Sequence, residues 1–266
     1  MTTSSALRLT GADVLPLLHR VTSQALADFA PGGARATLWC DFRGRLLHRA
    51  VVAVASDGAV WLLRHDAPGA ELAVVVDRSV FRDDVKIEDR SAELPVVLAP
   101  GDAGAGGVLE ESAGAPRVVA TGDGTRLVVG AGGTAPLPER ERIEWLLPRH
   151  GHEIREDFNP FEVGLARDVH LAKGCFTGQE ALQRLITYDS VRRRPVLVRV
   201  PADAAAPQDV LAAGGRAGVL TSVADRLGFA VVRRDAVARG DTLTLPDGSR
   251  LELLSAPEPA RPLGRP

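Results

Sequence analysis

Residues 173–180, which read Lys-Gly-Cys-Phe-Thr-Gly-Gln-Glu, are the part of this 266-residue chain best suited to chemistry. They include Cys175, one of two cysteines, and Lys173, one of two lysines. Thr177 and Glu180 have the spacing of a capping box, which predicts that a helix begins here. The positive end of that helix and the Lys173 ammonium both favour a thiolate, so we expect an exposed Cys175 with a lowered pKa. The residues alone equally allow a tight turn that buries a small, inert cysteine.

A second group of reactive side chains surrounds the other cysteine. Cys40, Asp41 and Arg43 lie in the run Trp-Cys-Asp-Phe-Arg-Gly-Arg at residues 39–45. We consider them a candidate second thiol site. Taken by themselves, these residue types favour a solvated hairpin tip, because Asp and Gly are typical of turns.

Glu144 is an unexpected carboxylate, since it stands between Ile143 and Trp145 in a segment whose apolar side should face inward. A half-buried carboxylate there could accept paired hydrogen bonds from a flat heterocycle with adjacent N–H donors, such as a pterin. The alternative is a surface glutamate paired with Arg140, four residues earlier on the same helix.

Two other segments carry weaker signals. The run His-Gly-His-Glu at residues 150–153 offers metal ligands, but their spacing on a loop is poor evidence, and we expect no metal. The glycine-rich segment 101–107 lacks the Lys-Ser/Thr ending of a phosphate-binding loop, so it predicts a flexible connection.

Apolar alternation and turn residues predict that the first part of the chain is rich in strands. A helix is expected to begin after a capping box at residues 10–13, another over 72–80, and a third over 139–147. A hairpin is expected around 122–124. The expected strands are 7–9, 34–40, 46–55, 59–64, 85–88 and 94–99.

The last part of the chain differs from the first. Several short strands at close spacing predict a small β-barrel or sandwich. The tail over 257–266 has four prolines and no apolar period, so we expect it to be disordered. The expected strands are 196–200, 218–223, 227–232, 242–245 and 251–254.

Composition narrows the class of protein. The net charge is -2 and the basic residues are scattered, which argues against direct binding of nucleic acid. We find no signal peptide and no apolar run of the about 20 residues needed to span a bilayer. Two cysteines far apart in the sequence suit a reducing, cytoplasmic location. They are also too few to supply all the ligands of an iron–sulfur cluster.

These segments together resemble the YgfZ-type folate-binding proteins, relatives of the aminomethyltransferase (T-protein) of the glycine cleavage system. The signature of that family is Lys-Gly-Cys-aromatic-x-Gly-Gln-Glu, and residues 173–180 match every position. The resemblance extends over most of the chain, from about residue 7 to 254. Further similar segments follow in the same order: 20–24, 40–45, 143–144, 151–154, 159–165, 218–222 and 227–230.

The resemblance implies an α+β fold, a GcvT/YgfZ-like ring of two interleaved α+β subdomains and a small C-terminal β-barrel. The folate-binding region would cover residues 1–190 and the barrel 191–256, followed by the tail. Tetrahydrofolate, or a one-carbon derivative, would lie in the central channel. By resemblance, Glu144 would hold the pterin ring, Cys175 would be the functional thiol and Cys40 a second one. The other implied folate-binding residues are Lys173, Gln179 and Arg192.

The function implied is that of a folate-binding accessory protein, which uses Cys175 to support iron–sulfur enzymes such as those that modify tRNA. One alternative is a folate-dependent one-carbon transferase, and another is a scaffold without folate. The transferase's catalytic aspartate has no clear counterpart near residues 63–66, where Glu71 is the nearest match. Its signature also has an acid where this chain has Cys175. The client enzyme and the oligomeric state remain open.

Overall fold

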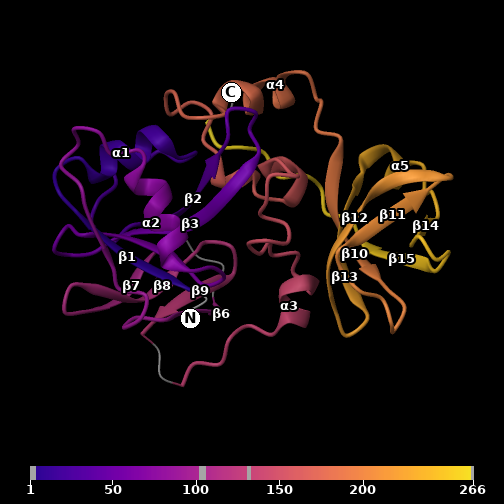
Figure 1. Ribbon diagram of the computed structural model, residues 1–266, viewed down its shortest axis with the longest axis horizontal. Coiled ribbons are helices and arrows are strands. Elements are labelled where there is room, and N and C mark those ends of the chain that lie inside the picture. Colours follow the sequence, from indigo (N-terminus) through magenta and orange to yellow (C-terminus); the bar gives the residue numbers. More distant parts are fainter. Residues whose placement is uncertain (1–3, 102–105, 131–132, 265–266) are drawn as a thin grey trace.

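The computed structural model describes residues 4–101, 106–130 and 133–264. Two antiparallel sheets lie together on one side of the molecule and a closed barrel lies on the other (Figure 1). A long segment with short helices connects them. The fold is therefore α+β with a C-terminal β-barrel, as the sequence predicts. Most of the glycine-rich segment 101–107 falls outside the described residues.

The first sheet is buried on both faces. Along β3, Ala50, Val52 and Val54 belong to the core beneath the helices, whereas Val51 and Ala53 face the second sheet. This alternation follows from the two-residue period of a strand. The sheet has the order β2-β3-β4-β1-β5, with strands β1 (Ser5–Thr10), β2 (Ala34–Cys40), β3 (Leu46–Val54), β4 (Val60–Arg64) and β5 (Lys86–Asp89). Its helices are α1 (Val14–Val21) and α2 (Gly69–Asp77).

The second sheet shares the apolar layer formed by Trp61, Leu63, Val119 and Leu127 with the first. The predicted hairpin around 122–124 joins two of its strands. Its order is β6-β9-β8-β7, with strands β6 (Val96–Pro100), β7 (Gly107–Ser112), β8 (Ala115–Ala120) and β9 (Thr125–Val129).

The barrel closes around inward-facing aliphatic side chains, among them Val196, Val198, Leu220 and Val232. Sequence analysis missed its β11 strand and the short α5 helix. The barrel order is β10-β13-β12-β11-β14-β15. These strands are β10 (Arg193–Arg199), β11 (Gln208–Ala212), β12 (Gly215–Ala224), β13 (Leu227–Arg233), β14 (Leu243–Thr244) and β15 (Arg250–Ser255), and α5 is Arg234–Ala238.

The connecting segment has its own apolar core, in which side chains of the first sheet and the barrel also take part. Leu38 and Leu46 come from the sheet, Phe229 from the barrel, and Phe158 and Phe176 from the connection. This core therefore joins the first sheet, the connecting segment and the barrel. The connecting elements are α3 (Glu139–Glu144), η1 (Pro160–Val163), η2 (Ala166–Asp168) and α4 (Gln179–Thr187).

Residues 257–264 of the C-terminal tail pack against the rest of the protein, contrary to our expectation of disorder, and residues 265–266 lie outside the described part. It crosses from the barrel to the region of α4 (Figure 1). Leu263 donates to Val169 O at 2.8 Å and accepts from Leu171 N at 3.0 Å. Ala260 packs against the connecting core. These distant contacts order the tail, and proline content could not reveal them. Among the described residues, no helix is long and apolar enough to cross a membrane.

Candidate functional site

The loop with the signature residues ends at Gly178, and α4 begins at Gln179. The predicted capping box is absent: Gly178 is the N-cap, no side chain caps the helix, and Glu180 pairs with Arg184. Gly178 has a φ of 85°, and a Cβ there would lie 2.4 Å from Asp41 O. Close packing on the turn after β2 therefore determines where the helix starts, and Thr177 does not.

The two cysteines differ sharply in environment. Cys175 is exposed on the signature loop, as expected for a reactive thiol, whereas Cys40 is buried in β2. Burial and the neighbouring charge of Asp41 raise the pKa of Cys40 to about 12. Burial therefore disfavours a reactive thiolate at Cys40, contrary to its expected role as a second thiol site.

Asp41 and Arg43, the other members of that predicted site, form a hairpin tip. Asp41 Oδ1 accepts from Arg43 N at 2.8 Å and from Arg45 N at 2.7 Å. The Arg43 guanidinium lies 5.1 Å from the ring centre of exposed Phe42. The structure thus matches the alternative of a solvated turn.

Lys173 ties the signature loop to α1. Its Nζ donates to His19 O, and the ammonium lies 4.8 Å from the ring centre of Phe176. His19 Nδ1 accepts from the backbone N–H groups of Leu26 and Ala27, so Nε2 carries the proton and donates to Lys173 O at 2.8 Å. Burial lowers the pKa of Lys173 to about 8.

Gln179 and Arg192 were predicted to bind folate with Lys173. Gln179 Nε2 donates to Leu171 O at 2.8 Å and so closes the base of the signature loop. Arg192 is exposed after α4 and forms no ion pair with another described residue. It lines a cavity of about 410 Å³ that also contacts Arg45, Arg193 and Arg233.

Glu144 does not lie where the resemblance implies. Its side chain is 45% exposed on α3, and its Oε2 accepts from Arg140 Nη1 at 3.2 Å. The surface alternative therefore describes Glu144, and the expected half-buried carboxylate is not found at this position.

A cavity of about 570 Å³ opens between the two sheets, α3 and the loop that follows it. We call it the central cavity. Its wall combines apolar side chains with ionisable ones. The lining residues include Val96, Leu98 and Leu137 on the apolar side and His65, Asp66, Glu139, Arg142, Arg149, His150 and His152 on the polar side.

Asp66 is the carboxylate of this cavity that sequence analysis overlooked. Burial disfavours its charge, but His65, the His150 N–H and Arg64 stabilise the carboxylate and lower its pKa. The His150 N–H donates to Asp66 Oδ2 at 2.7 Å. Burial lowers the pKa of His65. The sequence could have pointed to Asp66 through the polar run Arg-His-Asp at the end of β4, because residues that follow a strand often lie at the edge of a sheet.

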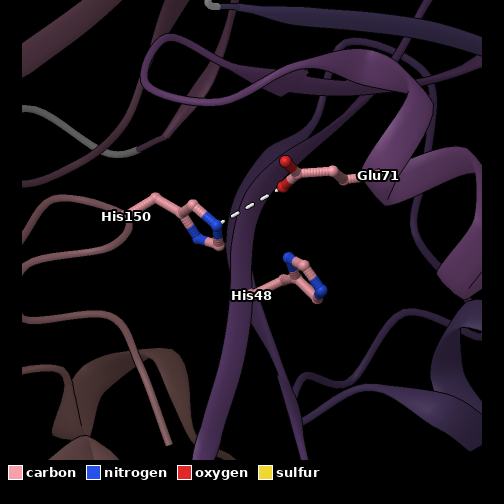
Figure 2. A group of neighbouring side chains, drawn as sticks. All are labelled: His48, Glu71 and His150. Atoms are coloured by element: carbon pink, nitrogen blue, oxygen red, sulfur yellow. Dashed lines mark ion pairs between the residues drawn. The ribbon is translucent and has the colours of Figure 1, made fainter.

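The potential metal ligands at 150–153 point in different directions. His150 lies beside His48 and Glu71 (Figure 2). His152 lies within 3.2 Å of Thr221 O. Glu153 is fully buried and accepts from Arg142, Thr221 and Ser222. The run therefore does not form one metal site.

Comparisons with known proteins agree with this architecture. Residues 192–258 match the family model described as CAF17, C-terminal beta-barrel domain. A putative chloroplastic transferase of Arabidopsis thaliana, At1g60990, is 30% identical over 113 residues, which are 40% of this chain and 26% of that protein. An aminomethyltransferase of Moorella thermoacetica is 42% identical over 86 residues, 30% of this chain and 22% of that protein. The matches thus span about a quarter of these relatives' length.

The fold as a whole resembles a solved structure. The crystal structure of the glycine cleavage system aminomethyltransferase T from Bartonella henselae superposes with a TM-score of 0.75 at 16% sequence identity. The superposition covers 96% of this chain and 83% of that chain. At this identity the likeness establishes the fold. The chain is therefore similar to aminomethyltransferases in fold and in part of its sequence, and its residues 192–258 match the CAF17 C-terminal β-barrel domain.

Proposed function

We propose that the protein binds tetrahydrofolate, or a one-carbon derivative, in the central cavity and supports iron–sulfur enzymes, such as those that modify tRNA, through Cys175. The observation that carries the folate proposal is the cavity itself. Its volume of about 570 Å³ suits a small molecule, and it lies inside an aminomethyltransferase fold.

The walls of the cavity match the chemistry of a folate. Val96, Leu98 and Leu137 offer apolar surface to the rings, and the partly exposed Arg149 offers donors. We assign the N–H donors of the pterin to Asp66, because Glu139, the other carboxylate of the lining, is already paired with Arg142 and Arg149, and Glu144 is not part of the lining. Arg192 lines a separate cavity, so a contact with the glutamate tail requires the tail to extend beyond the central cavity.

Calorimetry with 5-formyltetrahydrofolate tests this assignment. We expect the wild type to bind and Asp66→Asn to lose affinity at least about tenfold, since a buried N–H pair would lose its charged acceptor. Glu144→Gln is the matched control and should bind as the wild type does. No binding by the wild type would refute the folate proposal. Unchanged binding by Asp66→Asn would refute only the role of Asp66.

The role of Cys175 is supported by its exposure on a loop whose two ends are anchored by Lys173 and Gln179. A thiol-specific reagent at neutral pH should modify Cys175 faster than free cysteine and leave Cys40 unmodified until the protein unfolds. In cells that lack the protein, the wild type and Cys40→Ser should restore iron–sulfur enzyme activity, and Cys175→Ser should not. Restoration by Cys175→Ser would contradict the proposed role.

A one-carbon transferase is the second candidate, and the ionised Asp66 in the cavity favours it. A carboxylate near the reacting nitrogen of a folate can hold or move a proton. Transferase activity would appear as turnover of a one-carbon folate in the presence of an aminomethyl-carrying lipoyl protein. Activity that survives Cys175→Ser and disappears in Asp66→Asn would establish this reading over the accessory role.

A further inference from the structure

Three potential metal ligands converge at the edge of the central cavity (Figure 2). His48 comes from β3, Glu71 from the first turn of α2, and His150 from the loop after α3. One ligand atom of each residue lies within 4.8 Å of the others. The imidazole planes are nearly parallel, with an angle of 11° and ring centres 5.3 Å apart.

We propose that His48, Glu71 and His150 form a binding site for a divalent transition-metal ion such as Zn²⁺. Two imidazoles and one carboxylate are ligands that zinc accepts, and they leave a fourth position for water or a bound molecule. Bonds of about 2.0–2.2 Å to a tetrahedral ion would place the ligand atoms closer together than they are now. The Glu71 side chain, which is 51% exposed, is free to make this adjustment.

The hydrogen bonds of the two imidazoles fit this role. Arg64 Nη1 lies 3.0 Å from His48 Nδ1, and because a guanidinium only donates, Nδ1 carries a lone pair. The Asp66 carboxylate holds the backbone of His150 in place. His150 Nε2 lies 3.5 Å from Glu71 Oε2, so this nitrogen faces the other two ligands (Figure 2).

Arg64 is the competitor of such an ion. It supplies the positive charge of the cluster, yet its own contacts are incomplete. Nη2 donates to Pro68 O at 3.1 Å and lies 3.7 Å from Glu71 Oε2, and Nε has no partner within the described part of the chain. A metal ion would replace Arg64 Nη1 as the partner of the His48 Nδ1 lone pair, while the hydrogen bond from Arg64 Nη2 to Pro68 O can persist. Removing the guanidinium should therefore strengthen metal binding.

Binding of Co²⁺ to the full-length chain tests the proposal, because the visible absorption of Co²⁺ reports nitrogen and oxygen ligands without any assay of activity. Cys175→Ser serves as the background, so that the exposed thiol cannot bind the ion. We expect one Co²⁺ per chain, displaced by Zn²⁺. His48→Ala or His150→Ala should weaken binding at least about tenfold, and Arg64→Met should strengthen it about tenfold.

His152→Ala is the matched control, since His152 lies on the same loop but outside the cluster. It should bind Co²⁺ as the background protein does. If a histidine variant fails to fold, as judged by circular dichroism without metal, Glu71→Gln on the exposed side of α2 carries the same expectation. The proposal is overturned if neither the background protein nor Arg64→Met binds Co²⁺, or if His152→Ala weakens binding as much as His150→Ala.

Discussion

At the scale of single residues, Lys173 shows how the fold changes the chemistry of a side chain. The sequence places an ammonium near Cys175, and the structure shows that Lys173 is partly buried between α1 and Phe176. Burial disfavours the charged form and lowers its pKa to about 8, despite the opposing influence of nearby Cys175. The ammonium is therefore charged at neutral pH and loses its charge just above it.

The titration of Lys173 can be observed directly, because the chain has only two lysines. After reductive ¹³C-methylation, the NMR signal of Lys173 should titrate with a midpoint near pH 8, with exposed Lys86 as the reference. A midpoint near the ordinary lysine value of about 10.4 would contradict this environment. If Lys173 attracts the folate tail, folate affinity should fall as the pH rises through 8, because the cation is lost.

At the scale of elements, the start of α4 depends on a close backbone approach. Gly178 adopts a left-handed conformation and touches the turn after β2, where Gly44 in turn contacts Leu182. A side chain at residue 178 would meet Asp41 O and would also strain the backbone. The signature thus has a glycine there for packing, while Thr177 remains at the surface.

This difference predicts opposite outcomes for neighbouring substitutions. Gly178→Ala should lower the free energy of unfolding by about 2 kcal/mol or more, because strain and a clash add. Thr177→Ala should cost less than about 0.5 kcal/mol, since no cap is lost. Urea unfolding of both variants measures these values. If Thr177→Ala instead lowers the free energy of unfolding by about 1 kcal/mol, Thr177 does cap the helix.

At the scale of the whole molecule, Glu153 connects the barrel to the rest of the protein. Its buried carboxylate accepts from Ser222 Oγ at 2.7 Å and from Thr221 on β12. It also accepts from Arg142 Nη1 at 3.2 Å on α3 and from Arg149 N at 3.1 Å. With the connecting apolar core, this charged group holds the barrel against α3.

We expect Glu153→Ala to reduce the free energy of unfolding by about 3–5 kcal/mol, because Arg142 would be left buried without this partner. Glu252→Ala is the control: its pair with Arg199 is exposed, so it should cost less than about 0.5 kcal/mol. Chemical denaturation checks both. A loss in Glu153→Ala no larger than in Glu252→Ala would show that the barrel is held by apolar contacts alone.

Local patterns predicted much of the architecture. The bounds of β2 are those expected from the apolar run before the Asp41 turn, and the hairpin at 122–124 formed as the Gly-Asp-Gly sequence indicates. The short β11 escaped notice because only Val210 among its residues is buried. The tail was misjudged because contacts of Leu263 and Ala260 with distant residues order it.

The candidate site was predicted less well, for a related reason. Cys175 stands out in the sequence because a rare residue type lies in a long motif, and its exposure agrees with that interpretation. Glu144 was expected to be half-buried because Ile143 and Trp145 flank it, yet it is exposed and pairs with Arg140 on the same helix. Asp66 carries no motif, and only the meeting of β4, α3 and the following loop makes it part of a cavity.

The sequence by itself determined the strands and turns, the C-terminal barrel and the position of the exposed thiol, because periodicity, turn residues and rare residue types act locally. Only the tertiary structure decided which carboxylates line the central cavity, where α4 begins, and that His48, Glu71 and His150 meet. These features depend on side chains from distant segments, whose distances are set by the packing of sheets, connection and barrel on one another.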